Sequence, residues 1–408
     1  MVKTEYLLQR ISELEKETGI KRTIFAVCPN SMAVIKASFR AAKRNNAPIY
    51  FATTLNQVDC DGGYTGMNQS TFMKVLQQEA GAVNYAGMSI VAIDHGGPWL
   101  KDIQTKERWS AEKAMNAIKK SFEDAVTAGY DLIHVDPTVD IFLPAGETID
   151  IKLVAERTAE LINHVEKFRH ANGFSAISYE VGTEEVHGGL ADQATFDIFL
   201  VELKNKLKSY GLDDVWPVFI VGKVGTDLHT ATFDPEVAKV LTEKVKRVGS
   251  YIKGHYTDGV TNPEAYPQTG MGGANVGPEF TISEYEALEE LEELEKSLDA
   301  NGKIAQMSQI TDTLTSQVEQ SNRWQKWLLP EEKSLNFSEL SYERKSWIVK
   351  TCCRYIWQEP SALVARQRLY DNLERNGIEA ETIVLNRIEH DMDKYFRAFN
   401  LVNLNDNL

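Results

Sequence analysis

Short runs rich in β-branched residues alternate with longer amphipathic stretches from residue 23 to residue 276, and this alternation limits the fold more than any other feature. Alternating strand and helix patterns indicate parallel strands joined by crossover helices. The pattern repeats eight times, which fits a closed (β/α)₈ barrel of roughly 250 residues better than an open sheet. No GxGxxG motif follows the first strand, which weakens the dinucleotide-binding alternative. We therefore expect an α/β fold with a (β/α)₈ TIM barrel.

The patterns also predict where the elements lie. Strands are expected at residues 23–28, 48–53, 88–93, 132–135, 176–181, 218–221, 250–254 and 273–276. Helices are expected between them at residues 31–45, 70–80, 110–128, 151–169, 193–207 and 235–246. Two domains follow from this division: a catalytic barrel over residues 1–280 and a helical extension over residues 281–408.

The expected extension differs in composition from the barrel. A Glu- and Leu-rich amphipathic helix is expected over residues 280–298, followed by a polar stretch over residues 301–320. From Asn322 onward we expect helix, broken at Pro330 and Pro360. The acidic run is expected to form a solvated helix face; its members are Glu289, Glu290, Glu292, Glu293 and Glu295.

The net charge limits the classes of binding partner, and the cysteine spacing indicates the redox compartment. The formal charge of -15 argues against nucleic-acid and anionic-membrane partners, because both need a basic surface. No stretch approaches the ~20 apolar residues of a membrane span, and the N-terminal segment has no apolar signal region. The four cysteines form no CxxC pair, so we expect reduced thiols and a cytoplasmic protein. An acidic total still allows a locally basic pocket and an anionic substrate.

Histidines follow three of the expected strands. His95 follows the third strand, His229 the sixth and His255 the seventh. In a (β/α)₈ barrel the carboxyl ends of the strands carry the active site, so these imidazoles can converge on one divalent cation. The alternative for each is a hydrogen-bonded loop residue, but all three in register favour a metal site. We expect zinc there, with nickel, manganese or cobalt as alternatives.

Two further histidines lie near the predicted metal site, one as a competing ligand and one in a supporting position. His187 follows the fifth strand and competes as a ligand. His134 lies inside the fourth strand, two residues before Asp136, so it shares that residue's face and is expected to support the site from below.

Carboxylates stand beside these histidines at the strand ends. Either Glu180 or Asp94 is expected to complete the metal site, and another member of the set to act as general acid/base; the set is Asp94, Asp136, Glu180 and Asp258. The alternative is salt bridging to Lys223 or Lys253. Those two lysines also raise a class I interpretation, in which one of them forms a Schiff base with a carbonyl substrate.

Two loops contain candidates for substrate binding. The loop after the second strand offers Asn56, Gln57, Gly63 and Tyr64, although an ordinary tight turn would read the same. After the eighth strand, residues 275–278 place Asn275 and backbone N–H groups at a helix start, where phosphate can bind. Lys223 completes this set of candidates.

Several of these segments together resemble a known family, the so-called non-catalytic subunit of class II D-tagatose-1,6-bisphosphate aldolase. The resemblance rests on residues 56–58 (Asn-Gln-Val) and 62–67 (Gly-Gly-Tyr-Thr-Gly-Met), on Asp94-His95, on residues 134–136 (His-Val-Asp) and on later motifs up to Val276-Gly277-Pro278. It implies a class II aldolase-like barrel with histidine metal ligands after strands three, six and seven.

The chain departs from that family pattern at two points. The accessory subunits have an apolar residue at the position of Glu180. Catalytic class II aldolases have an acid in a similar setting, as this chain does. The Gly- and Ser-rich phosphate turn after the strand-seven histidine is missing, and residues 256–258 (Tyr-Thr-Asp) stand there. Both departures imply a catalytic chain that acts on an unphosphorylated or differently anchored ketose. The family also implies relatives that are ketose 4-epimerases on free hexuloses or hexuronates.

Three functional hypotheses follow. The leading one is a 4-epimerase that interconverts ketohexoses such as tagatose and fructose, or their uronate forms, by retro-aldol cleavage of C3–C4 and re-addition to the turned aldehyde. The alternatives are a class II tagatose-bisphosphate aldolase or its non-catalytic stabilising subunit, and a class I Schiff-base aldolase. A ketose is the expected substrate; a homo-oligomer or a catalytic aldolase subunit is the expected partner. The aromatic-rich extension either caps the barrel mouth or forms a dimer interface.

Overall fold

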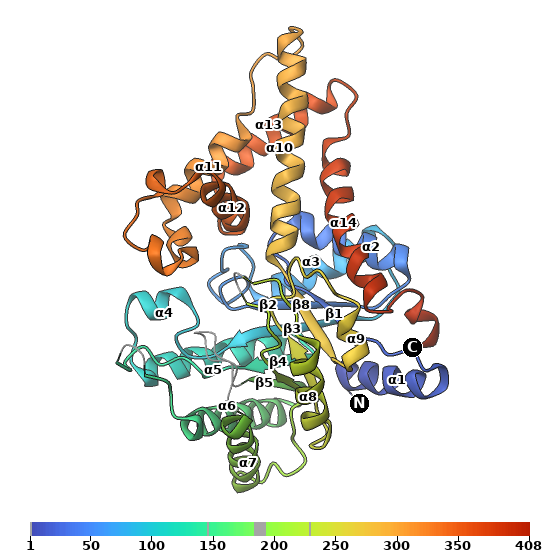
Figure 1. The fold of residues 1–408 in the computed structure, drawn as a ribbon, viewed down its shortest axis with the longest axis vertical. Helices are drawn as coiled ribbons and strands as arrows, with labels where there is room; N and C mark the ends of the chain where they lie inside the picture. The colour runs from blue at the N-terminus through green and yellow to red at the C-terminus, as the bar shows by residue number, and fades with distance from the viewer. Residues whose placement is uncertain (1, 145–146, 183–192, 228–229) are drawn as a thin grey trace.

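The computed structural model describes residues 2–144, 147–182, 193–227 and 230–408. Its centre is a closed barrel in which each strand pairs in parallel with the next and β8 pairs with β1 (Figure 1). The strands are β1 (Ile24–Val27), β2 (Ile49–Thr54), β3 (Ser89–Gly96), β4 (Leu132–Val135), β5 (Ser178–Gly182), β6 (Phe219–Val221), β7 (Tyr251–Gly254) and β8 (Gly273–Val276). The predicted (β/α)₈ barrel is confirmed.

The six predicted barrel helices are present, and the structure adds three that were not predicted. The barrel helices are α1 (Lys3–Thr18), α2 (Met32–Asn45), α3 (Gln69–Ala82), α4 (Asp102–Lys106), α5 (Ala111–Ala128), α6 (Ile151–Asn172), α7 (Gln193–Ser209), α8 (Pro235–Lys246) and α9 (Ala265–Thr269), of which α1, α4 and α9 are the additions. Side-chain caps begin several of them: Ser31, Ser110 and Asp150 each accept a backbone N–H of the first helical turn. α1 lies at the opposite end of the barrel from the site, since Lys3 reaches Ser89 O at the start of β3.

The extension begins with the long helix α10 and contains both α- and 3₁₀-helices. These are α10 (Pro278–Ala300), α11 (Ile310–Ser321), η1 (Arg323–Trp327), η2 (Pro330–Glu332), η3 (Phe337–Glu339), α12 (Tyr342–Cys352), η4 (Cys353–Tyr355), α13 (Pro360–Glu374), α14 (Ala380–Ala398) and η5 (Leu404–Asn407). The helix expected from Asn322 onward is thus a series of short 3₁₀ turns up to residue 339. Among the described residues, no helix is long and apolar enough to span a bilayer.

The expected solvated acidic face is wrong at two positions. Glu292 and Glu295 are buried, and Glu295 accepts hydrogen bonds from Ser308 and Asn372. Those partners lie on other segments of the extension, so their distance from Glu295 along the chain hid them from the sequence pattern.

The last helix returns to the barrel. α10 rises away from the strands and α14 runs back to pack against α2 and α10 (Figure 1). Phe25 of β1 stacks on Tyr395 at 5.3 Å and meets Phe396 edge-on at 5.1 Å. The backbone N–H of Asn403 donates to the Asn45 carbonyl at 2.8 Å. One hydrophobic core therefore continues from the barrel into the extension, and α10 runs unbroken through residue 280.

Candidate metal and substrate site

A β-bulge at the end of β3 brings two neighbouring side chains to one place. The pairing of β3 with β4 shifts register before Gly96, and His95 has a φ of 49°. Successive side chains of a regular strand point to opposite faces, whereas a bulge re-aims one of them. Asp94 and His95 can therefore face the same point. Gly97 allows this arrangement, since a Cβ there would lie 1.7 Å from the Asp136 carbonyl oxygen.

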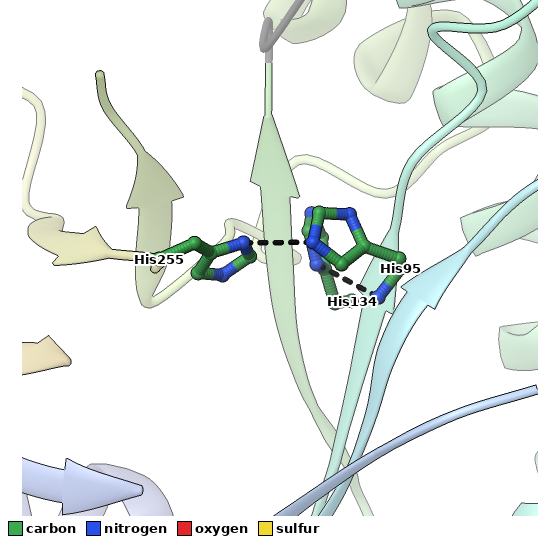
Figure 2. Close-up of side chains that lie close together, drawn as sticks. All are labelled: His95, His134 and His255. Atoms are coloured by element: carbon green, nitrogen blue, oxygen red, sulfur yellow. Dashed lines mark hydrogen bonds between the residues drawn. The ribbon is translucent and has the colours of Figure 1, made fainter. Parts of the chain in front are cut away.

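Three imidazoles and two carboxylates meet at this end of the barrel, and Figure 2 shows the imidazoles. His255 Nδ1 lies 2.9 Å from His95 Nε2, and His255 Nε2 lies 3.0 Å from Glu180 Oε1. His134 Nδ1 lies 3.4 Å from Asp94 Oδ1. Ligand atoms of Asp94, His134, Glu180 and His255 all lie within 4.8 Å of one another, as do those of the three histidines.

Two contacts fix the orientation of His95. Its Nδ1 lies 2.6 Å from Asp136 Oδ2, and its backbone N–H donates to His134 Nδ1 at 3.1 Å (Figure 2). Histidines that bind metals commonly hold their second ring nitrogen against a carboxylate, which fixes the tautomer. His134 lies in the supporting position expected for it, and its ring is also close enough to be a ligand.

The carboxyl groups of the cluster are buried, yet their pKa values are low. Burial alone would raise the pKa of Glu180, but Lys253, whose Nζ lies 2.7 Å away, and the imidazoles lower it to about 2. Burial also opposes ionisation of Asp94, and the charges of His95 and His255 outweigh it, so its pKa lies well below the usual range. The same balance, dominated by the His95 hydrogen bond, lowers the pKa of the adjacent Asp136 to about 2.

The donor set fits a divalent cation. Three buried carboxylates face one buried ammonium within the described part of the site: Asp94, Asp136 and Glu180 against Lys253. When the imidazoles are neutral, as metal-binding histidines are, the carboxylates outnumber the ammonium, and such an excess of buried negative charge is costly unless a cation compensates it. Imidazole and carboxylate together are ligands that zinc accepts, and nickel, manganese and cobalt use the same atoms.

Asp258 follows β7 and has a different environment. Its Oδ1 accepts the backbone N–H groups of Gly277 at 2.9 Å and Glu279 at 2.8 Å, which caps α10. Burial raises the pKa of Asp258 to about 6, and the Glu279 charge adds to this, while the two backbone hydrogen bonds lower it by less. The N–H groups expected to bind phosphate are therefore already bonded to this carboxylate.

The cluster opens into a cavity of about 220 Å³ that the barrel and the extension share. Its lining from the barrel includes Asp94, His95, His255, Asp258 and Asn275, and its lining from the extension consists of Arg323, Lys326, Trp327, Arg354 and Tyr355. Asp102 at the start of α4 pairs with Arg323 at 2.6 Å and also with Lys326. A larger cavity of about 1140 Å³ lies beside η1, but the described residues that line it include no member of the cluster.

The model of the D-tagatose-1,6-bisphosphate aldolase subunit GatZ/KbaZ-like family matches residues 8–396 of the chain. The chain belongs to this family. The family resemblance predicted from the motifs is thereby confirmed over nearly the whole sequence, and with it a place among aldolase-related proteins of tagatose metabolism.

Two solved structures are similar to this GatZ/KbaZ-like chain. A probable tagatose 6 phosphate kinase from Sinorhizobium meliloti 1021 matches with a TM-score of 0.75 and 22% identity, covering 92% of this chain and 100% of that one. The fructose-bisphosphate aldolase Fba from Campylobacter jejuni matches with a TM-score of 0.57 and 12% identity, covering 97% and 94%. At these identities the likeness supports the shared fold.

The residues predicted to bind substrate differ in how available they are. Asn275 is buried and lines the cavity, and its amide has no hydrogen-bond partner in the described part of the chain. Tyr64 also lines the cavity and donates to Asn30 at 2.9 Å. The side chains of Asn56 and Gln57 line it too, but their amides hold neighbouring loops, for example through the Asn56 bonds to residues 100 and 102.

Two of the predicted substrate residues do not line this cavity. Gly63 shapes the turn instead, because its φ is 52° and a Cβ would lie 2.3 Å from the Gln57 carbonyl oxygen. Lys223 follows β6 and is absent from the described lining. Lys253 is likewise absent from it, and its ammonium pairs with Glu180, which weakens the Schiff-base interpretation.

Some predicted residues lie outside the described part of the chain, and others were missed. His229 and the competing His187 fall in the segments 228–229 and 183–192, which the structure does not describe. The cavity residues of the extension were not predicted individually. Arg323 follows α11 and Arg354 follows α12, and no local pattern marks either as facing the barrel.

Proposed function

We propose that this GatZ/KbaZ-like chain is a metal-dependent ketose enzyme that makes and breaks the C3–C4 bond. The observation that supports it most is the buried excess of carboxylates beside converging imidazoles at the carboxyl ends of the strands. A purely structural barrel end gains nothing from such a cluster, because each buried charge costs free energy. His95 and His255 are the proposed ligands, with Glu180 or Asp94 completing the set and His229 a further candidate.

The chemistry divides between the cation and the side chains. The bound cation would supply Lewis-acid stabilisation for the negative charge that develops on the C2 ketone oxygen. The C4 hydroxyl proton passes to a carboxylate and the C3–C4 bond breaks. Its electron pair forms the C2–C3 enediolate of the three-carbon fragment C1–C3, and C4 becomes an aldehyde carbon. When the enediolate adds back to C4, the carboxylate returns the proton to the C4 oxygen. Addition to the original face of the aldehyde restores the substrate, and addition to the opposite face inverts C4.

Asp258 is the carboxylate best placed to move that proton. Asp94 and Glu180 face the imidazoles, and Asp136 is bonded to His95 and to the Thr138 hydroxyl. Asp258 lines the same cavity, its Oδ1 is held by two backbone N–H groups, and its pKa of about 6 suits proton transfer near neutral pH. Asn275, whose amide has no hydrogen-bond partner among the described residues, is the proposed partner for a sugar hydroxyl.

Net aldol cleavage and C4 epimerisation use the same bond and differ only in what happens to the aldehyde. Membership of an aldolase-subunit family favours the aldolase reaction or its support. The small cavity walled by the extension favours epimerisation, because an aldehyde kept from solvent can turn and re-add. We therefore propose 4-epimerisation as the finer activity of this chain.

One experiment tests the reaction. The purified chain, alone, is incubated with fructose, tagatose, their phosphates and their uronate forms, with and without a chelator, and products are followed by NMR. We expect a C4 epimer without accumulating triose, and loss of activity on metal removal. Steady release of triose with no epimer would replace epimerase by aldolase.

The family description also favours a second candidate, a subunit that supports a separate catalytic aldolase chain. This hypothesis predicts no turnover by the chain alone and a gain in the rate or stability of a partner aldolase on mixing. Metal content separates it further: a His95→Ala/His255→Ala double variant that keeps the metal content of the unmodified chain would end the proposed metal site under either hypothesis.

A further inference from the structure

Arg354 carries a buried charge that forms no ion pair with any described residue, although Asp258 across the cavity is near enough to interact with it electrostatically. Its residue is 7% exposed, and it lies on η4 of the extension, in the wall of the cavity opposite the barrel. The guanidinium donates to the Tyr355 hydroxyl at 3.0 Å and lies over the rings of Trp327 and Tyr355, at 4.3 and 4.8 Å from their centroids. No carboxylate among the described residues pairs with it. A buried guanidinium without an ion pair is costly, which indicates that an anion completes it.

Two further N–H groups in the same wall are buried without an acceptor among the described residues. Arg323 spends one nitrogen on Asp102, but its buried Nε has no partner in the described chain, and its guanidinium lies 4.1 Å from the Tyr355 ring centroid. The indole N–H of Trp327 is buried and unpartnered in the same sense. These groups line the cavity on the side of the extension, and within the described chain the Arg323 Nε–H and the Trp327 indole N–H are buried donors without an acceptor.

The other wall of the cavity has the opposite charge. Asp94 and Asp258 line it together with the imidazoles, so positive charge from the extension faces the metal and proton-transfer groups of the barrel. A linear ligand with its reacting oxygens at the cluster would place its far end at Arg354. At about 220 Å³ the cavity is smaller than the roughly 300 Å³ at the low end of ligand pockets, which fits one monosaccharide.

We propose that Arg354, assisted by Arg323 and Trp327, binds a single terminal oxyanion of the ketose, either a carboxylate or a phosphate monoester. This proposal rests on the proposed function for the orientation of the sugar. It assigns the anion site to the helical extension. The sequence predicts phosphate binding at the N–H groups after β8, but these groups donate to Asp258. The extension therefore selects anionic sugars over neutral ones and is not only a lid.

Calorimetric binding with the full metal-loaded chain tests this without needing turnover. The probes are neutral tagatose, a hexuronate and a hexose 6-phosphate. We expect the chain to bind one of the anionic sugars at least about tenfold more tightly than tagatose, as a charge-assisted hydrogen-bond pair provides. The anion that gives the larger ratio identifies the terminal group. Equal affinity for all three sugars would overturn the proposal.

Variants assign the preference to residues. Arg354→Gln should abolish the preference for the anionic sugar over tagatose, and Arg354→Lys should keep part of it. Arg387→Gln is the control: it removes an equal charge from an exposed ion pair on α14 and should leave the preference unchanged. A folded Arg354→Gln protein that keeps the full ratio would overturn the assignment. If that variant does not fold, Arg323→Gln tests the assignment instead, because Arg323 is more exposed and its replacement disturbs the fold less. The affinity ratio of anionic sugar to tagatose must also fall in this variant. Binding without turnover would contradict the proposed function and leave this site supported.

Discussion

His95 takes part in the cluster because its backbone adopts a conformation that a histidine seldom adopts. The left-handed φ and the bulge cost free energy, and the contacts of its ring and N–H with Asp136 and His134 hold it there. Strain of this kind is commonly kept where it orients a functional group. At the scale of single residues, then, the site depends on backbone positions as much as on ligand side chains.

Gly97 gives the first test of that dependence. We expect Gly97→Ala to destabilise the protein by about 3 kcal/mol and to impair metal binding, because the added Cβ collides with the Asp136 carbonyl and displaces the bulge. Gly81→Ala is the control: it lies in α3 with nothing within 4 Å of an added Cβ, and should stabilise by about 0.5 kcal/mol. Chemical denaturation measures both. Equal stabilities would contradict a tight approach at Gly97.

Asp136 gives the second test at this scale. Asp136→Asn should weaken metal binding by about 10- to 100-fold with little change in fold, because an amide can still contact His95 but no longer supports its charge. Metal titration by competition with a chelating dye gives the dissociation constant. Asp124→Asn, on the exposed face of α5, is the matched control. An unchanged constant in Asp136→Asn would remove His95 from the ligand set.

At the scale of elements, Asp258 links β7 to α10 and so joins the chemistry to the extension. Its carboxylate caps the helix that carries the rest of the extension, and the same residue lines the cavity. An asparagine can cap a helix nearly as well as an aspartate but cannot accept the substrate proton. The two roles are therefore separable by one substitution.

Asp258→Asn should lower kcat at least about 100-fold while the helix stays capped. Its effect on stability should depend on pH. Because the folded pKa of Asp258 is raised to about 6, the unmodified protein loses stability relative to the variant as pH rises from about 4 to 6, by at most about 3 kcal/mol. Denaturation at pH 4 and pH 7 measures this difference.

Asp234→Asn serves as the control for this substitution, since Asp234 caps α8 away from the cavity. Full activity in Asp258→Asn would assign proton transfer to another group. A constant stability difference between pH 4 and 7 would contradict the raised pKa.

The elements of the barrel could be predicted from sequence because each strand is a short buried run between helices of clear period. Asp94, His95 and His255 could be predicted as neighbours because parallel strand ends converge in a barrel. The inward turn of His95 could not, since a bulge has no signature in β-branched content. Arg354 and Glu295 could not either: their burial is decided by segments that are distant in the chain and leave no local pattern.

At the scale of the whole molecule, α14 anchors the extension to the barrel through the shared core, whereas ion pairs join η1 to α4 at the barrel mouth. Asp102 pairs with Arg323 and Lys326 across the cavity rim. Part-exposed pairs of this kind each contribute about 0.2–1 kcal/mol, so the contact can open without unfolding either part. Substrate entry and product release require such an opening, and retention of an aldehyde requires that it be slow.

Asp102→Ala tests this balance. Losing both pairs should raise amide exchange in residues 323–327 by about 2- to 30-fold and raise the share of free aldehyde over epimer. Hydrogen exchange by mass spectrometry reads the first effect without depending on the reaction, and an aldehyde trap reads the second. Glu290→Ala, which loses an exposed pair with Arg387, is the control. Unchanged exchange would mean that Asp102 does not hold the extension closed.

Phe25 packs against Tyr395 and Phe396, so β1 cannot complete its packing until α14 has been synthesised. A ribosome that adds about 5–20 residues per second completes β1 and then needs roughly 20–75 s to deliver α14. Throughout that interval the outer face of β1 lacks its contacts with α14. A nascent chain released before Ala380 would keep an apolar strand open to other chains, so messages truncated near the 3′ end should yield aggregates rather than a shorter working barrel.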